Sequence, residues 1–349
     1  MSTGAVVSGW GCAFPPAQPQ EHYWDGFYGP GVGGDRWLRR AFMSAGCERR
    51  HTVFDPTVED LSACSTGRRM ERYIAAALPL ATGAAVAALE SAGVAATEIG
   101  LLCVASCTGY ATPGLDVALA EALGAGTGLR RMLLGHMGCH AALPGLGAAS
   151  EYASTRRRPA LLVCAEVCSL HAQPPSTDLE QVVAHALFSD GAAALVVAPV
   201  GAGLEVVDLA AATDASAAGH LRWEVTDRGF RMGLARQLPD AVGRQVGPLV
   251  DGLLAGRGLH RDDVAGWAVH PGGPRVLQVV ADRLGLDSGR LLNSRQVLAE
   301  HGNCSSPTIL VVLDRVRTGL AGAGGWVVAL AFGPGLTLYG VLLRADGPP

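Results

Sequence analysis

Lysine is absent from this sequence of 349 residues, so all 27 basic side chains other than histidine belong to arginine. The absence excludes enzymes that need a lysine amine, among them pyridoxal Schiff-base enzymes, imine-forming aldolases and proteins with a Walker phosphate loop. Charged residues are also scarce, at 17%, whereas hydrophobic residues make up 49%. This composition is typical of a globular chain with a large core, and it excludes a largely disordered one.

Other missing features argue against several classes of partner. The formal net charge of −4 provides no basic field that would attract nucleic acid. The first residues do not combine a basic segment with an apolar one, so we expect no secretory signal. An uncharged run over 318–343 is long enough to span a membrane, but its glycines and its proline favour two strands around a turn. We therefore expect neither a nucleic-acid nor a membrane partner.

The nine cysteines are odd in number and scattered along the chain. Without a secretory signal, this pattern predicts reduced thiols and a cytoplasmic protein. The pairs Cys103/Cys107 and Cys164/Cys168 have a wider spacing than the CxxC pattern typical of zinc sites. We expect no metal and no bound cofactor.

Short apolar runs alternate with longer runs at helical spacing, which predicts an α/β layered protein. The expected strands cover 100–106, 160–167, 192–200, 266–270, 326–333 and 336–343, and the expected helices cover 72–92, 115–123, 141–154, 240–254, 274–284 and 307–320. Pro79 inside the first helix predicts a kink or an early end.

A turn-rich segment near residue 200 divides the chain into two parts, 1–200 and 201–349, each with strand–helix alternation. A duplicated architecture is one interpretation, although no clear sequence repeat is visible. The glycine-rich loop over 26–34 follows no clear strand and does not match GxGxxG, so a dinucleotide site is not expected.

The segment LLGHMGCHAALPGLGAAS places Cys139 after a glycine and directly before a helix of small residues. A thiol at a helix start meets unpaired N–H groups and the positive end of the helix dipole, both of which favour the thiolate. A buried cysteine that acts only as a small hydrophobe fits the local sequence as well. His136 and His140 flank it, but no further ligand set supports a metal site.

Two later segments add residues that could work with such a thiol. His270 ends an apolar run before a Pro-Gly-Gly turn, and Asn303 lies in a tight turn that opens a helix. Each has a structural alternative, as a core histidine and a helix N-cap. Together with Cys139 they could serve acyl chemistry on thioesters, because His stabilises thiolate and both His and Asn donate hydrogen bonds to an oxyanion.

Five motifs in one chain carry a resemblance to a known family. They are the Gly138-Cys139 pair, LFSDGAAALVV over 187–197, HPGGP over 270–274, GNCSSPT over 302–308 and FGPGLT over 332–337. In this order they closely resemble the type III polyketide synthases, the chalcone synthase-like ketosynthases. The similarity covers most of the chain, from SCTGYATPGLD onward.

The resemblance implies a thiolase-like αβαβα fold with two pseudo-duplicated halves and a homodimer. It implies a catalytic set of Cys139, His270 and Asn303. Cys139 would take up an acyl-CoA starter, and His270 and Asn303 would assist decarboxylation of malonyl-CoA. The resulting enolate would extend the chain by two carbons. Phe188 matches the gatekeeper phenylalanine between the CoA tunnel and the cavity.

The chain departs from the plant members at other expected positions. Met232 falls at the second gatekeeper, although Phe230 could occupy it by a shift of two residues, and the loop 222–228 looks longer than in plants. The resemblance further assigns substrate binding to Cys107, His171, Gly219, Ser305, Phe332, Gly272 and Gly273, and CoA phosphate binding to Arg36, Arg39 and Arg40. Arginine forks suit phosphate, although a solvated basic face is an equal alternative for these three.

The leading hypothesis is a malonyl-CoA-dependent polyketide synthase that makes a small pyrone or a resorcinol-type ring, with aliphatic or malonyl starters preferred to 4-coumaroyl-CoA. One alternative of the same fold is a ketoacyl-carrier-protein synthase III-like enzyme that condenses once. A cysteine hydrolase and a non-catalytic ketosynthase-like partner are further alternatives.

Overall fold

The apolar runs form a single nine-stranded sheet in the computed structural model, which describes residues 4–346. Its strand order is β11-β12-β13-β8-β1-β7-β6-β4-β5. The strands are β1 (Val6–Ala13), β4 (Leu101–Ser106), β5 (Arg130–Gly135), β6 (Ala160–Val167), β7 (Asp190–Ala198), β8 (Leu204–Thr213), β11 (Val264–Val269), β12 (Gly325–Gly333) and β13 (Thr337–Ala345). Every residue of β6 is buried, as expected for a strand covered on both faces.

The sheet contains the same arrangement twice. In one half β1 pairs antiparallel with β7, β7 antiparallel with β6, and β6 parallel with β4. In the other half β8 pairs antiparallel with β13, β13 antiparallel with β12, and β12 parallel with β11. The halves join where β1 pairs with β8 over only two residues, Val6 and Val7. The α/β fold with two duplicated halves is thus confirmed.

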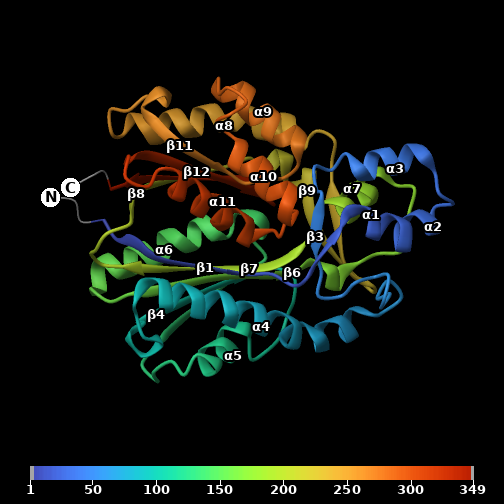
Figure 1. The fold of residues 1–349 in the computed structure, drawn as a ribbon, viewed down its shortest axis with the longest axis horizontal. Helices are drawn as coiled ribbons and strands as arrows, with labels where there is room; N and C mark the ends of the chain where they lie inside the picture. The colour runs from blue at the N-terminus through green and yellow to red at the C-terminus, as the bar shows by residue number, and fades with distance from the viewer. Residues whose placement is uncertain (1–3, 347–349) are drawn as a thin grey trace.

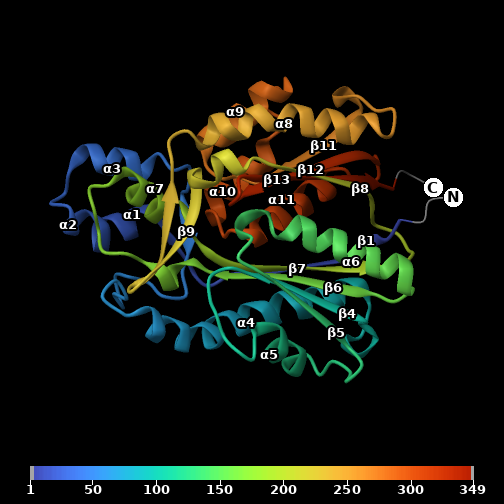
Figure 2. The same cartoon turned by 180° about the vertical axis from the view of Figure 1, so that it is seen from behind.

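Helices cover both halves in layers (Figure 1, Figure 2). The first half carries α4 (Thr66–Ala92) and α5 (Leu115–Ala122) on its outer face, and the second carries α8 (Leu238–Ala255) and α9 (Pro274–Leu284). Between the two halves lie α6 (Ala142–Arg156) and α11 (Ser306–Gly319). Equivalent places in the two repeats are therefore occupied by α6 and α11.

Helix α4 is continuous over 27 residues, so the kink or early end expected at Pro79 does not end the helix. Pro79 lies on the exposed side of the helix, where the carbonyl that loses its hydrogen bond can be satisfied by water. By length and composition α4 could span a membrane, but here it packs on β1, β7 and β6. The uncharged run over 318–343 forms the end of α11 and the strands β12 and β13, as predicted.

One end of the layers is built from segments that the periodicity did not predict (Figure 1). It contains the helices α1 (Gln20–Tyr23), α2 (Gly29–Gly31), α3 (Arg36–Met43), α7 (Leu179–Leu187) and α10 (Leu292–His301). It also contains two small two-stranded sheets, β2 (Ala17–Pro19) with β3 (Arg49–His51), and β9 (Leu221–Thr226) with β10 (Gly229–Leu234). The expected loop 222–228 is therefore mostly a β-hairpin.

Candidate active site

Cys139 lies in a short 3-10 turn, Gly138–His140, that leads into α6. The preceding glycine has φ +74°, and a Cβ at that position would lie 2.7 Å from the Pro334 ring, so only glycine fits. The thiol is 5% exposed and belongs to the same apolar cluster as Phe188, Met232 and Phe332.

Burial raises the pKa of the Cys139 thiol to about 11, and the charge of Glu166 contributes to the rise. Hydrogen bonds from Ser305 and Asn303 act in the opposite direction and favour the thiolate. The effect of burial on the pKa of Cys139 is therefore larger than that of the helix start, which was expected to favour the thiolate. In the resting protein Cys139 is a neutral thiol that needs a proton acceptor before it can attack.

His270 directly follows β11, and its backbone N–H donates to Leu330 O of β12 at 2.8 Å. The side chain is completely buried, and burial lowers its pKa to about 3. Neither ring nitrogen has a hydrogen-bond partner among residues 4–346. Phe332 packs edge-on against the ring, with centroids 5.5 Å apart. A buried neutral imidazole with two free nitrogens is available to accept one proton and then donate from both positions.

Asn303 occupies the turn between α10 and α11 and is 1% exposed. Its backbone N–H donates to Leu187 O at 2.9 Å, and its carbonyl accepts from Ser189 N at 3.0 Å, so it forms a parallel bridge with Phe188. Its Oδ1 accepts from Ser305 N at 2.8 Å, which leaves the amide N–H groups as the free donors. Ser305 itself has φ +59°, a strained value for a residue with a side chain.

Glu166 is a buried acidic residue beside Cys139 that the sequence analysis missed. It is completely buried at the end of β6 and accepts from Cys107 N at 2.9 Å, Thr108 Oγ1 at 2.8 Å and Ser306 Oγ at 2.8 Å. Burial raises its pKa. The Cys107 sulfur lies 3.4 Å from Glu166 Oε1 and 3.8 Å from Ser305 Oγ, so the expected cavity residues Cys107 and Ser305 lie together. A charged residue inside the apolar run ALLVCAEV was the available signal.

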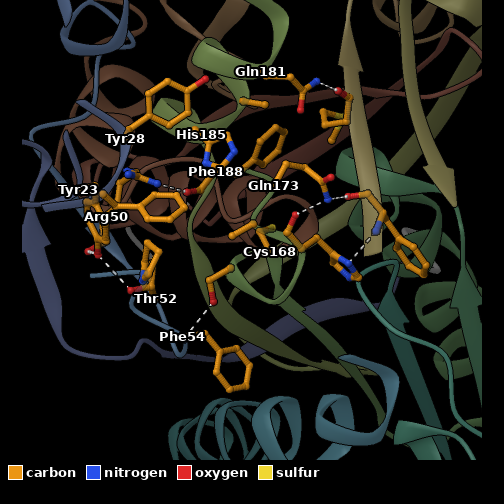
Figure 3. Close-up of a pocket in the computed structure, with 18 of the residues that line it drawn as sticks. Tyr23, Tyr28, Arg50, Thr52, Phe54, Cys168, Gln173, Gln181, His185 and Phe188 are labelled. Atoms are coloured by element: carbon orange, nitrogen blue, oxygen red, sulfur yellow. Dashed lines mark hydrogen bonds between the residues drawn. The ribbon is translucent and has the colours of Figure 1, made fainter. Parts of the chain in front are cut away.

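The two expected gatekeepers lie on neighbouring segments. Phe188 caps the end of α7, Met232 lies on β10, and both line an inner cavity of about 70 Å³ (Figure 3). Phe230 lines it too, but its ring stacks on His171 with centroids 4.3 Å apart. Only Met232 shares the apolar cluster of Cys139 and Phe188, so Met232 rather than Phe230 fits the second gatekeeper place.

His171 lines the inner cavity, as expected, and its ring is fixed on both sides. Nε2 donates to Thr108 O at 2.6 Å, and Nδ1 accepts from Phe230 N at 2.9 Å. Burial lowers its pKa to about 4, so it is neutral. The ring anchors the β9–β10 hairpin to the segment directly after β4, which carries Cys107 and Thr108.

The expectation for Gly219 is wrong. This glycine is exposed in the turn before β9, and a Cβ there would meet nothing within 4 Å. The reason is that 222–228 continues as strand and turn, which brings Trp223 to the cavity instead, directly opposite Met232 in the hairpin. Trp223 was not predicted, although it alternates with Leu221 in a pattern typical of a strand.

An outer cavity of about 820 Å³ lies between α3, α7 and the start of α9. Its lining includes the expected residues Gly272 and Gly273, together with two arginines, Arg236 and Arg275. The expected arginines of α3, Arg36, Arg39 and Arg40, are exposed and do not line it. The helix instead turns Trp37, Ala41 and Ser44 to the cavity, because residues three and four apart share one face.

Two family models together match most of the chain: "Chalcone and stilbene synthases, N-terminal domain" over 45–202 and the corresponding "C-terminal domain" over 208–346. The chain belongs to the chalcone and stilbene synthase family. It is a type III polyketide synthase and hence a decarboxylating condensing acyltransferase.

Individual relatives support the same family. A "1,3,6,8-tetrahydroxynaphthalene synthase" of Streptomyces peucetius subsp. caesius is 37% identical over 328 residues, 89% of this chain and 85% of the relative. The "Alpha-pyrone synthesis polyketide synthase-like Pks18" of Mycobacterium tuberculosis is 36% identical over 78% of this chain and 72% of its own. A crystal structure of "PKS-I from the brown algae Ectocarpus siliculosus" has a TM-score of 0.92 at 27% identity and covers 99% of both chains.

These matches do not favour the synthase III alternative. Within this type III polyketide synthase, the structure brings the thiol of Cys139, the amide of Asn303 and the hydroxyl of Ser305 together, at the starts of the equivalent helices α6 and α11. Such an arrangement suits thioester chemistry in a site closed to water.

Proposed function

We propose that this synthase loads an acyl-CoA starter onto Cys139, extends it with malonyl-CoA and releases a small cyclised product. The supporting observation is that two buried groups with different surroundings, the thiol of Cys139 and the imidazole of His270, both pack in the region of Phe332. Cys139 carries hydrogen-bond donors from Asn303 and Ser305, while His270 is neutral with both ring nitrogens free. A thiol, a proton acceptor and fixed donors are what transfer of an acyl group between thioesters requires.

In this proposal His270 takes the thiol proton of Cys139, and the resulting thiolate attacks the starter thioester. The CoA thiolate is expelled and takes up the proton from His270, so that it leaves as the free thiol. Malonyl-CoA then places its thioester oxygen between His270 and the amide of Asn303. Loss of carbon dioxide transfers two electrons to form an enolate on that oxygen. The enolate carbon attacks the acyl-cysteine, a carbon–carbon bond forms, and the Cys139 thiolate leaves. The lengthened chain is then carried on CoA.

We assign the outer cavity to the CoA portion of both substrates. It is the larger of the two cavities, and Gly272 and Gly273 in its lining lie two and three residues after His270. Glycines allow a ligand to approach the backbone closely. The phosphates would meet Arg236 and Arg275, which line this cavity, rather than the outward-facing arginines of α3.

The inner cavity supports small starters. Its volume is about 70 Å³, and Trp223, His171 and Phe230 fill the space beside Met232. A flat aromatic acyl group would need these rings to move. We therefore propose acetyl-, malonyl- or short aliphatic starters in preference to 4-coumaroyl-CoA, with pyrone or resorcinol-type products.

The test is incubation of the purified protein with malonyl-CoA alone and with acetyl-, octanoyl- or 4-coumaroyl-CoA, followed by mass spectrometry of products. We expect carbon dioxide release and pyrone or resorcinol masses, with the starter mass on the peptide that contains Cys139. Cys139→Ala is the control and should form no product. A starter mass on Cys107 or Cys168 would contradict the assignment, and a clear preference for 4-coumaroyl-CoA would contradict the starter class.

We also propose that the protein is a cytoplasmic homodimer. Strand β5 is the edge of the nine-stranded sheet, and most of its residues are exposed. Leu133 is 47% exposed and Met132 39% exposed on this edge, and an open strand with apolar side chains favours pairing with another chain. Light scattering would show a dimer, and Leu133→Glu should shift it to monomer. A monomeric wild type would contradict this proposal.

A further inference from the structure

The inner and outer cavities are separated by two chain segments. Phe188 and Met232 line the inner cavity, whereas Leu187, one residue before Phe188, and Leu234, two residues after Met232, line the outer one. Under the proposed function, on which this inference rests, an acyl group must pass between these two segments. The width of the passage then depends on where their backbones are held.

Phe188 is held by a buried arginine. Arg50 Nη1 donates to Phe188 O at 2.9 Å, while Arg50 Nε donates to Gln20 Oε1 at 2.6 Å and the guanidinium stacks over Tyr23 at 4.1 Å (Figure 3). Arg50 is 5% exposed and forms no ion pair with a carboxylate within residues 4–346. The carboxylates of Asp190 and Asp55 act on this buried cation only from beyond ion-pair distance, so the oxygen atoms that it contacts directly are firmly held.

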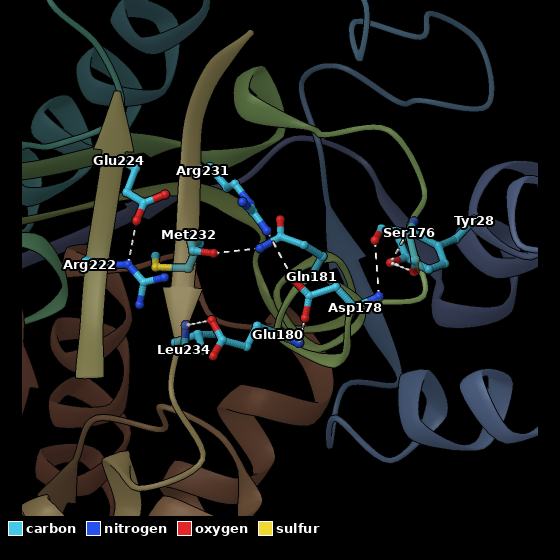
Figure 4. Close-up of polar contacts among 10 residues, drawn as sticks. All are labelled: Tyr28, Ser176, Asp178, Glu180, Gln181, Arg222, Glu224, Arg231, Met232 and Leu234. Atoms are coloured by element: carbon cyan, nitrogen blue, oxygen red, sulfur yellow. Dashed lines mark hydrogen bonds and ion pairs between the residues drawn. The ribbon is translucent and has the colours of Figure 1, made fainter. Parts of the chain in front are cut away.

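Met232 is held in the same manner by a buried amide. Gln181 Nε2 donates to Met232 O at 2.8 Å, and Gln181 is 4% exposed (Figure 4). Gln181 lies on α7, seven residues before Phe188 and hence on the same face of the helix. The hairpin that carries Met232 belongs to a sheet of only two strands, so its position depends on such bonds to neighbouring elements.

We propose that Arg50 and Gln181 are positioning residues that set the width of the passage between Phe188 and Met232, and thereby the size of acyl starter that crosses it. Each donates to the backbone of one gate residue rather than to substrate. Gln181 lies on α7 and Phe188 ends it, so the positions of both gate residues, Phe188 and Met232, depend on this one helix. Starter selection thus depends on backbone anchoring as well as on the gate side chains.

The test compares starters of different length. Gln181→Leu removes the donor to Met232 O, and Gln181→Glu keeps the shape but cannot donate at neutral pH. We expect both variants to raise kcat/KM for octanoyl-CoA relative to acetyl-CoA by about 10-fold. Arg50→Lys keeps the charge but can serve only one of the two acceptors of Arg50, and it should shift the ratio in the same direction by less.

The matched control is Arg231→Gln. Arg231 is the neighbour of Met232 and pairs with Asp178 at the start of α7 at 3.1 Å, but on the exposed side of the hairpin (Figure 4). An exposed ion pair contributes little, so the ratio should not change. Malonyl-CoA decarboxylation needs no starter and reports whether a variant retains a working site.

The outcomes separate the two proposals. If decarboxylation persists and the starter ratio of Gln181→Leu or Gln181→Glu equals that of Arg231→Gln, the positioning role is refuted. A shift of the same size in Arg231→Gln would refute it as well, because the effect would then belong to the hairpin in general. A wild-type protein that fails to decarboxylate malonyl-CoA would instead refute the proposed function.

Discussion

Replacement of His270 by glutamine should change how the reactivity of Cys139 depends on pH. Burial raises the pKa of Cys139 to about 11 when no acceptor takes its proton. At pH 7 such a thiol is ionised in about one molecule in 10⁴, and four pKa units correspond to about 5 kcal/mol. In the wild type we expect His270, whose ring nitrogens are free, to take that proton; because burial lowers its own pKa to about 3, this transfer needs the thiolate charge close to the ring. The neutral glutamine side chain cannot take that proton.

The assay is the rate of carbamidomethylation of Cys139 by iodoacetamide, followed by peptide mass spectrometry between pH 6 and 10. We expect a nearly flat wild-type rate between about pH 7 and 9. For His270→Gln we expect a rate that falls tenfold for each unit by which the pH is lowered. At pH 7 this rate should be about 10²- to 10⁴-fold lower than that of the wild type. Cys139→Ala gives the background from the other thiols. If His270→Gln follows the wild-type profile, His270 is not the proton acceptor and the reasoning fails.

Three further predictions concern catalysis, CoA binding and stability. Asn303→Ala should lower malonyl-CoA decarboxylation by about 100- to 1000-fold, measured as carbon dioxide release, because one oxyanion donor is lost; a nearly wild-type rate would contradict its role. Arg275→Ala should raise KM for acyl-CoA by about 10-fold but leave KM for an N-acetylcysteamine thioester unchanged, and equal effects on both would argue against a phosphate contact. Acidification should destabilise the fold between about pH 6.5 and 4, because burial lowers the pKa of several histidines, so the folded state binds fewer protons than the unfolded one there. Asp190, whose pKa burial raises to about 6, and Glu166, whose pKa burial also raises, oppose this in part, so urea unfolding should show a lower stability at pH 5 than at pH 7; equal stability at the two pH values would disprove it. The histidines are His140, His171 and His301, whose pKa falls to about 4, and His185 and His270, whose pKa falls to about 3.

The parts of the fold that the sequence predicted have local signals. Strand β6 was placed with its observed ends because it is apolar throughout and buried on both faces. Helix α9 was placed with its observed ends because Pro274 suits the first helical turn and Gly285 ends the helix with φ +70°. Of the kink or early end expected at Pro79, the early end was wrong, because Pro79 lies on the side of α4 that faces water.

The proposed catalytic residues were inferred by a different route. Cys139, His270 and Asn303 each had an equally good structural explanation, and only their order within family motifs distinguished them. Glu166 remained undetected because its donors come from the end of β4, the two residues after it and the start of α11, which lie far from Glu166 in the sequence. Gly219 was expected in the cavity because the segment 222–228 was treated as a loop. In the structure this segment is part of a hairpin, and the pairing of its strands places Trp223 opposite Met232 at the cavity.

The position of α6 and α11 between the two repeats has a consequence for synthesis of the protein. When the first 200 residues have left the ribosome, α6 can pack on its own sheet, but the surface destined for α11 stays exposed to water. The edge of strand β1 that pairs with β8 also stays unpaired until β8 has been synthesised. A fragment cut near residue 200 should therefore aggregate when expressed alone, and co-expression with the missing fragment should restore soluble protein. Although the repeats are equivalent in architecture, we therefore expect them to fold as one cooperative unit.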